Sequence, residues 1–376
     1  MREPIGLIAY ALDRKPSGIG QYTLRLMEAL SSSGCEPLIL QSGGWPENFR
    51  PGSHQTIPLP GTALLPLLLS LGQLQIGWHT RRMGLKLVHD PTGTIPLGFC
   101  PAKRVTTICD TIPLVFPEVS SVLERLIYQL WLPLVVKKMD ALITISQHSK
   151  SDLQKHLKVP TEKINVTPLS AGNKFRVLPR SEIETSLVRV GVERTYILSV
   201  GSVEPRKNLL RLLDAYHLLL KWSKRWRLVI VGAPNYWKSS PVVAKVERMG
   251  LQDQVQFTGY IPDEDLPALF NGADLFCFPS LYEGFGLPVL EAMACGTPVV
   301  TSNGSSLPEV AGEAAILVNP NNINEITSAM QRVLEDPELA NDLRQRGLEQ
   351  AAQFTWEKTA HETIAVYEKV LGEKLL

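Results

Sequence analysis

The chain has 376 residues, with 38 lysines and arginines against 37 aspartates and glutamates, so its formal net charge is +1. Hydrophobic residues make up 44% of the chain and charged residues 20%, which is typical of a globular protein and excludes a largely disordered one. A chain of this length is too long for one ordinary hydrophobic core, so we expect two domains.

The charges are unevenly spread along the chain. Residues 1–185 carry 20 basic against 14 acidic side chains, whereas residues 186–376 carry 18 against 23. A basic first half favours an anionic acceptor or an anionic membrane surface, and compositional scatter explains it equally well.

The five cysteines are odd in number, widely spaced and contain no Cys-x-x-Cys pair. This spacing argues against a disulfide framework and against a zinc site, and it favours a reducing compartment. The N-terminus leads directly into a strand-like run without a signal peptide, so we expect a cytoplasmic protein.

Short apolar strands alternate with amphipathic helices along the chain, which is the pattern of parallel α/β domains. In the first half we expect a helix over residues 21–30 and strands at residues 5–9, 38–40, 87–89, 104–108, 141–145 and 164–167. A polar, irregular stretch around residues 173–193 is the expected linker. In the second half we expect helices at residues 208–220, 265–271 and 325–335, and strands at residues 196–200, 228–231, 255–257, 275–278, 298–300 and 315–318.

The segment between Arg50 and Arg81 contains no aspartate, glutamate, lysine or arginine. Its leucine-rich core, residues 63–71, is shorter than the ~20 residues that span a bilayer, and it contains a proline. Two interpretations stay open: a helix buried in the core, or a helix lying in the membrane interface. The second would place the first domain at the inner face of the plasma membrane.

The most informative stretch is residues 283–291, Glu-Gly-Phe-Gly-Leu-Pro-Val-Leu-Glu. Its two glycines permit a tight turn that a ligand can approach closely, and Pro288 suits the first turn of a helix. That helix would point free N–H groups and the positive end of its dipole at an anion. Glu283 and Glu291 would contact opposite ends of one extended ligand and accept hydrogen bonds from its hydroxyl groups. A sugar, a diphosphate and a ribose, in that order, fit this arrangement.

Residues 201–208 place two cations directly after an expected strand. Arg206 offers a planar fork of donors for phosphate oxygens, and Lys207 offers a compact charge. When a diphosphate leaves, two such cations and a helix N-terminus can stabilise the developing charge without a metal ion. The alternative is a solvated Arg-Lys pair at the start of a helix.

The Glu-x7-Glu stretch resembles the signature of the retaining glycosyltransferases of family four. The resemblance extends to Ser17-Gly18-Ile19-Gly20, to residues 201–208 and to Phe354-Thr355-Trp356-Glu357, so it covers nearly the whole chain. It implies the GT-B fold, in which two Rossmann-like domains face each other across a cleft. We then expect an acceptor-binding domain over residues 1–185, a nucleotide-sugar-binding domain over residues 186–355, and a final helix within residues 356–376 that crosses back.

The resemblance also implies roles for single residues. Arg206 and Lys207 would bind the donor diphosphate, Glu283 the transferred sugar, and Glu291 the ribose. Further donor contacts are expected from Gly18, Gly20, Ser202, Tyr260, Phe285, Gly286 and Leu287. No metal ion or other cofactor and no nucleic acid is implied.

Residues 107–113 depart from the family pattern. Relatives often carry a histidine immediately before Asp110, and here Cys109 stands in its place, which cannot supply the proton chemistry of an imidazole. We therefore carry over Asp110 but not Cys109, so the catalytic candidates are Glu283, Arg206, Lys207 and Asp110. His89, which ends another expected strand, is either structural or part of the site.

The expected function is transfer of a hexose, glucose or mannose, from a UDP- or GDP-linked donor with retention of the anomeric configuration. The acceptor would be a saccharide or a lipid-linked saccharide in surface polysaccharide synthesis. A sugar-nucleotide epimerase of the same fold and a non-catalytic nucleotide-sugar-binding protein are the alternatives. A nicotinamide dehydrogenase is disfavoured, because Gly-x-Gly-x-x-Thr at residues 18–23 is one glycine short of the dinucleotide fingerprint.

Overall fold

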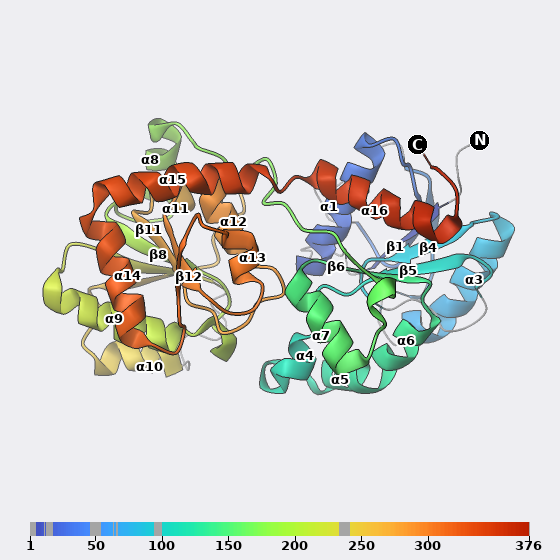
Figure 1. Ribbon diagram of the computed structural model, residues 1–376, viewed down its shortest axis with the longest axis horizontal. Coiled ribbons are helices and arrows are strands. Elements are labelled where there is room, and N and C mark those ends of the chain that lie inside the picture. The colour runs from blue at the N-terminus through green and yellow to red at the C-terminus, as the bar shows by residue number, and fades with distance from the viewer. Residues whose placement is uncertain are drawn as a thin grey trace. The chain divides into compact units, whose positions relative to one another are not determined.

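The computed structural model describes residues 5–10, 12, 18–45, 54–62, 64, 67–93, 100–232 and 241–375. The chain divides into two compact units (Figure 1): the first comprises Met1–Leu169 with Thr355–Leu376, and the second comprises Ser170–Phe354. The boundary expected between residues 185 and 186 falls inside helix α8 (Arg180–Arg189), which packs on α11 (Leu266–Gly272) of the second unit. About half of the stretch interpreted as a linker is therefore helical, and the apolar side chains of Ile183 and Leu187 are buried there.

The first unit is built on a seven-stranded parallel sheet with the order β3-β2-β1-β4-β5-β6-β7. Its strands are β1 (Ile5–Ala9), β2 (Leu38–Gln41), β3 (Thr56–Pro58), β4 (Leu87–Asp90), β5 (Lys103–Thr107), β6 (Ala141–Thr144) and β7 (Ile164–Val166). All except β3 were expected. This three-residue edge strand ends in a proline, a residue that lacks the N–H that an inner strand needs.

Helices cover both faces of this sheet. They are α1 (Gly18–Ser32), α3 (Gln73–Arg82), α4 (Ile112–Val115), α5 (Val122–Leu126), α6 (Leu132–Lys138), α7 (Gln147–Leu157) and α16 (Trp356–Leu371), with π-helical segments η1 (Leu68–Gly72) and η3 (Ile127–Trp131) and 3-10 turns η2 (Pro117–Val119) and η4 (Thr161–Lys163). Figure 1 shows α1 and α16 on one side of the sheet and α6 on the other. No helix in these ranges is long and apolar enough to cross a membrane.

The last helix, α16, returns to the first unit and packs against α1. Its Tyr367 is fully buried, and the Tyr367 hydroxyl lies 2.7 Å from Nδ1 of His89 on β4. Nε2 of the same imidazole lies 2.8 Å from the Thr107 hydroxyl. This buried polar chain joins the C-terminal helix to two strands of the sheet.

The second unit contains a six-stranded parallel sheet with the order β10-β9-β8-β11-β12-β13. Its strands are β8 (Tyr196–Val200), β9 (Arg227–Val231), β10 (Val255–Gly259), β11 (Leu275–Phe278), β12 (Val299–Ser302) and β13 (Ile316–Val318). Besides α8 and α11, its helices are α9 (Leu209–Trp222), α10 (Pro241–Arg248), α12 (Leu287–Ala294), α13 (Leu307–Ala311), α14 (Ile323–Glu335) and α15 (Pro337–Ala352), with a 3-10 turn η5 (Pro205–Lys207).

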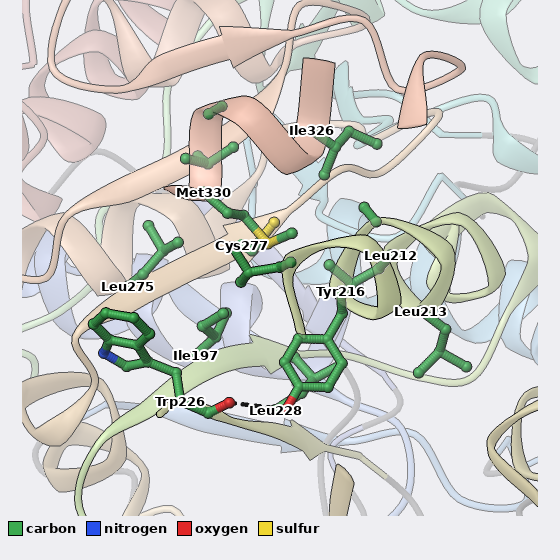
Figure 2. Packing of buried hydrophobic residues seen from close by; sticks show 14 of the residues in the cluster. Ile197, Leu212, Leu213, Tyr216, Trp226, Leu228, Leu275, Cys277, Ile326 and Met330 are labelled. Carbon is green, nitrogen blue, oxygen red and sulfur yellow. Dashed lines mark hydrogen bonds between the residues drawn. The ribbon is translucent and has the colours of Figure 1, made fainter. Parts of the chain in front are cut away.

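A large apolar core supports this second sheet. Figure 2 shows side chains of α9, such as Leu212 and Tyr216, meeting strand residues such as Ile197 and Leu228. The buried Tyr216 hydroxyl donates to the Trp226 carbonyl at 2.8 Å, so this polar group is satisfied inside the core. The strands are apolar on both sides because helices cover both faces of a parallel sheet, and this is why they were predictable from short apolar runs.

Candidate functional site

The turn before α12 depends on a glycine in a left-handed backbone conformation. Gly286 has a φ of 109°, in the left-handed region, and α12 begins at the next residue with Pro288 in its first turn. A Cβ added at Gly286 would lie 2.7 Å from Cδ2 of Leu307, so a larger residue would clash there. Within the described ranges, the N–H groups of Phe285, Gly286 and Leu287 donate to no acceptor. They form a cluster of donors at the positive end of a helix, as anion binding requires.

Glu283 lies at the centre of a buried cluster of charges and is only 7% exposed. Its Oε1 accepts hydrogen bonds from Lys207 Nζ and from Ser280 Oγ, both at 2.7 Å. Its Oε2 accepts one from Arg206 Nη1 at 2.9 Å. A carboxylate has about four positions that can accept a hydrogen bond, and three donors occupy those of Glu283, so about one position remains, on Oε2.

The charges in this cluster fix its ionisation state. Burial raises the pKa of Glu283, but the positive charges of Lys207 and Arg206 outweigh burial and hold that pKa below its ordinary value. Burial lowers the pKa of Arg206, whereas Glu283 and Glu204 more than offset this and raise it. Burial also lowers the pKa of Lys207, and the charge of Glu283 opposes that lowering. Ion pairs of 2.7 and 2.9 Å join Glu283 to Lys207 and Arg206 in a triad, and both cations lie beside the turn.

The loop carrying the two cations is itself ordered by polar contacts. Ser202 Oγ donates to Glu204 Oε1 at 2.6 Å, and Glu204 Oε2 accepts from Arg206 Nε at 2.7 Å. Asn208 adopts a φ of 59°, and its buried Nδ2 donates to the carbonyls of Pro279 and Pro320 at 2.9 and 2.7 Å. Glu204 and Asn208 thus fix where Arg206 and Lys207 lie.

Two serines that the sequence did not single out hold the turn from its other side. Ser305 Oγ accepts the Glu283 N–H at 3.0 Å. The buried Ser306 hydroxyl lies within donating distance of the carbonyls of Glu283 and Phe285, at 2.9 and 2.7 Å. With Ser280, these hydroxyls form the polar support of the turn. Nothing in the local sequence singles out Ser305 and Ser306, because the groups that they contact lie more than 20 residues away along the chain.

Glu291 lies in a different charge environment from Glu283. It is half-buried on α12, and burial raises its pKa to about 8, with a smaller lowering by Lys174 and a further rise from Asp263. The Lys174 ammonium pairs with the Asp263 carboxylate at 3.3 Å. Tyr260, just after β10, is 57% exposed. The two glutamates therefore occupy separate surroundings, and their roles in binding stay predictions.

Gly18 and Gly20 belong to the first turn of α1, which begins at Gly18 rather than at residue 21. Neither glycine has a positive φ, so the expected glycine loop is helical at these positions, and Ser17 lies outside the described residues. Within this part of α1, the Thr23 hydroxyl donates a hydrogen bond to the Ile19 carbonyl four residues earlier, at 3.0 Å, as threonines in helices commonly do.

The Cys109-Asp110 segment follows β5. Asp110 Oδ1 accepts the Ile112 N–H at 2.9 Å, an arrangement that orders the start of α4. Burial and the neighbouring Asp110 charge raise the pKa of the Cys109 thiol to about 12, so this thiol is neutral. Nothing in these contacts gives Cys109 the chemistry of a histidine.

His89 is a structural residue. It is fully buried, both ring nitrogens face hydroxyl groups, and burial lowers its pKa to about 3. Its neutral imidazole therefore links β4 to α16 and β5.

Two family models match the chain. The model described as Glycosyltransferase Family 4 matches residues 16–169, and that of Glycosyl transferases group 1 matches residues 188–350. The second match contains the ion-paired cluster and α12.

Among similar proteins is the O-antigen chain mannosyltransferase B of Escherichia coli, 39% identical over 230 residues that cover 60% of each chain. The MMP alpha-(1->4)-mannosyltransferase of Mycolicibacterium hassiacum is 35% identical over 63% of this chain and 56% of its own. The chain therefore spans less than two thirds of these two relatives. The O-antigen chain mannosyltransferase RfbU of Salmonella typhimurium is 27% identical over 87% of this chain and 90% of its own.

Solved structures share the fold at low sequence identity. A sucrose-phosphate synthase from Thermosynechococcus elongatus superposes with a TM-score of 0.78 and 23% identity, covering 99% of this chain and 100% of its own. WaaG, a glycosyltransferase involved in lipopolysaccharide biosynthesis, superposes with a TM-score of 0.73 and 17% identity over 98% and 100%. The chain belongs to the group 1 glycosyltransferases of family four and has the GT-B fold.

Proposed function

We propose that the protein transfers a hexose, in the first instance mannose, from a nucleotide diphosphate sugar to a saccharide or lipid-linked saccharide acceptor in surface polysaccharide synthesis. The observation that carries this proposal is the buried cluster of Glu283, Lys207 and Arg206 beside the N–H groups of residues 285–287, which donate to no acceptor in the described part of the chain. Mannosyltransferases among the relatives support mannose over glucose. Transfer would take place in the cytoplasm.

The donor diphosphate would occupy the N-terminus of α12. The N–H groups of Phe285, Gly286 and Leu287 would donate to its oxygens, and Arg206 and Lys207 would supply positive charge from the side. The remaining acceptor position on Glu283 Oε2 would take one sugar hydroxyl, and Glu291 would take the ribose hydroxyls. Because Arg206 and Lys207 are already held in place, they would stabilise the charge on the leaving diphosphate without a metal ion.

Retention of configuration fits the state of Glu283. A nucleophilic carboxylate needs a free oxygen pointing at the anomeric carbon, whereas three donors already engage this one. We therefore assign Glu283 to positioning. The bond from the anomeric carbon to the phosphate oxygen breaks, and the bond to the acceptor oxygen forms on the same face. The departing phosphate oxygen takes the acceptor proton. In this proposal Asp110, Gly18 and Gly20 keep the roles that the resemblance implies.

The proposal is tested with purified protein, GDP-mannose, UDP-glucose and a panel of oligosaccharide acceptors, with and without EDTA. We expect acceptor-dependent release of one nucleoside diphosphate, unaffected by EDTA, and an NMR product spectrum showing the anomeric configuration of the donor. Inversion at the anomeric carbon would overturn the retaining assignment. A new nucleotide sugar formed without acceptor would establish the epimerase instead, and binding without consumption of any donor would establish a binding protein.

A further inference from the structure

Two helical segments of the first unit carry rows of large, exposed apolar side chains. The first row, which we call stripe one, runs along η1 and α3 and consists of Leu67, Leu71, Leu74 and Trp78. These side chains are 43%, 46%, 74% and 55% exposed. Their spacing of four, three and four residues places them on one side of a helix, as in an amphipathic helix whose apolar side lacks a partner.

Stripe two runs along α5, η3 and α6 and consists of Leu123, Leu126, Leu130 and Leu134. These leucines are 52%, 46%, 65% and 49% exposed. They too recur at intervals of three or four residues. Soluble surfaces carry single apolar side chains without consequence, but contiguous exposed rows mark an interaction surface.

Both stripes lie on the outer side of helices that cover the same face of the sheet. The inward side chains of these helices, such as Ile76 of α3 and Val135 of α6, pack in one core cluster with Val88 of β4 and Leu142 of β6. α1 and α16 cover the opposite face through a separate cluster (Figure 1). The two stripes therefore point away from the same face of the first sheet.

Exposed cations lie at the end of each stripe. Arg81 and Arg82 close α3, and Lys137 and Lys138 close α6. In the described part of the chain none of these four has a carboxylate within ion-pairing distance, and no acidic residue occurs between Glu47 and Asp90. The Arg82 guanidinium lies 4.9 Å from the centre of the Trp78 ring, so an apolar anchor and a cation share one site.

The cations beside the two stripes indicate which kind of partner binds there. A second copy of the chain would bring these cations against their own like charges, which is unfavourable in a symmetric contact. An anionic bilayer satisfies both features, because leucine and tryptophan side chains enter the boundary between headgroups and acyl chains while arginine and lysine meet lipid phosphates. We propose that stripes one and two dock the first unit on an anionic phospholipid membrane.

The experiment is flotation of the full-length protein with vesicles of phosphatidylcholine alone or mixed with phosphatidylglycerol. We expect several-fold more protein to float with the anionic vesicles, and less as salt screens the cations. Trp78→Ser with Leu130→Ser should lower the bound fraction by about tenfold, and Arg81→Glu with Arg82→Glu should abolish the preference for anionic vesicles. Val188→Ser, which alters an exposed apolar side chain of the second unit, is the matched control and should float like the wild type.

Three results would overturn the proposal. The first is failure of the wild type to float with anionic vesicles, and the second is equal flotation of all variants. The third is a dimer in sedimentation velocity that the stripe variants convert to monomer, which would assign the surface to a second copy. Thermal unfolding of each variant checks that it folds. No nucleotide sugar enters either assay, so the outcome is independent of the proposed transferase reaction.

Discussion

Glu283 joins two functions in one side chain, because it neutralises two buried cations and lies beside the turn that would receive the donor. A buried cation without a counter-ion costs several kcal/mol, so the triad has to be complete for this part of the second unit to fold well. The same cations are the groups that a leaving diphosphate needs. Stability and the proposed chemistry therefore depend on the same three residues.

Replacing Lys207 by alanine tests this dependence. We expect kcat/KM to fall by about 10²–10³-fold, because one preorganised cation at the leaving diphosphate is lost. The melting temperature should also fall, because Glu283 keeps only Arg206 as a charged partner. Lys224→Ala, at an exposed lysine of the same unit, is the control for both measurements. Steady-state turnover equal to that of the wild type would remove Lys207 from the site.

Glu291 gives a prediction about pH. Its folded-state pKa of about 8 lies above the ordinary 4.5, so the folded protein keeps a proton that the unfolded chain releases between these pH values. Its contribution to stability is complete below the lower value and is lost as the pH rises through the higher one. Glu291→Gln should therefore be more stable than the wild type at high pH, by about 2 kcal/mol, and not at acidic pH. Urea unfolding at both pH values measures this, and an equal difference at both would contradict the burial argument.

The charged residues of the site were predictable, whereas their polar supports were not. Arg206, Lys207 and Glu283 stand in short local patterns whose chemistry can be deduced from neighbouring residues. Ser305 and Ser306 act on a turn more than 20 residues away in the sequence, and Asn208 reaches a carbonyl 112 residues away. Only the assembled sheet brings such partners together, so spacing along the chain carries no sign of them.

At the scale of elements, the turn into α12 depends on a residue without a side chain. Gly286→Ala combines a left-handed φ with a clash against Leu307, and we expect it to cost about 2–4 kcal/mol. Gly250→Ala is the matched control, because that glycine has a φ of +67° and no atom within 4 Å of the added Cβ. It should cost only about 1 kcal/mol. Equal losses in chemical denaturation would show that the contact with Leu307 is unimportant.

The errors in predicting the elements share a physical cause. The inner strands were predictable because a parallel sheet covered on both faces leaves nearly continuous apolar runs. β3 was missed because an edge strand of three residues needs few apolar side chains. α8 was mistaken for a linker because only one narrow side of this helix, including Ile183 and Leu187, is buried and the rest is largely polar. Within the described residues 67–71, Leu68 is buried, as expected of a helix packed in the core, whereas Leu67 and Leu71 are exposed. Contact of this segment with a membrane interface stays a prediction.

At the scale of the whole molecule, the first unit is completed by a helix from the end of the chain. Tyr367→Phe on α16 keeps the ring but removes the hydroxyl that faces His89, and so leaves a buried imidazole nitrogen without a partner. We expect a loss of about 1–3 kcal/mol of folding free energy. Tyr128→Phe, at a partly buried tyrosine of the same unit, is the comparison. Hydrogen exchange should show the loss in α16 and β4 first, and unchanged protection there would contradict a role for this contact.

The central claim is that the second unit binds a nucleoside diphosphate through Arg206, Lys207 and the N-terminus of α12. Isothermal titration of GDP, UDP and ADP into the wild type and the Arg206→Ala/Lys207→Ala double variant tests it most directly. We predict that one of the three binds the wild type and that the double variant loses at least about 100-fold in affinity, while Lys224→Ala binds normally. Equal binding by the wild type and the double variant, or no binding of any diphosphate to the wild type, would contradict the account.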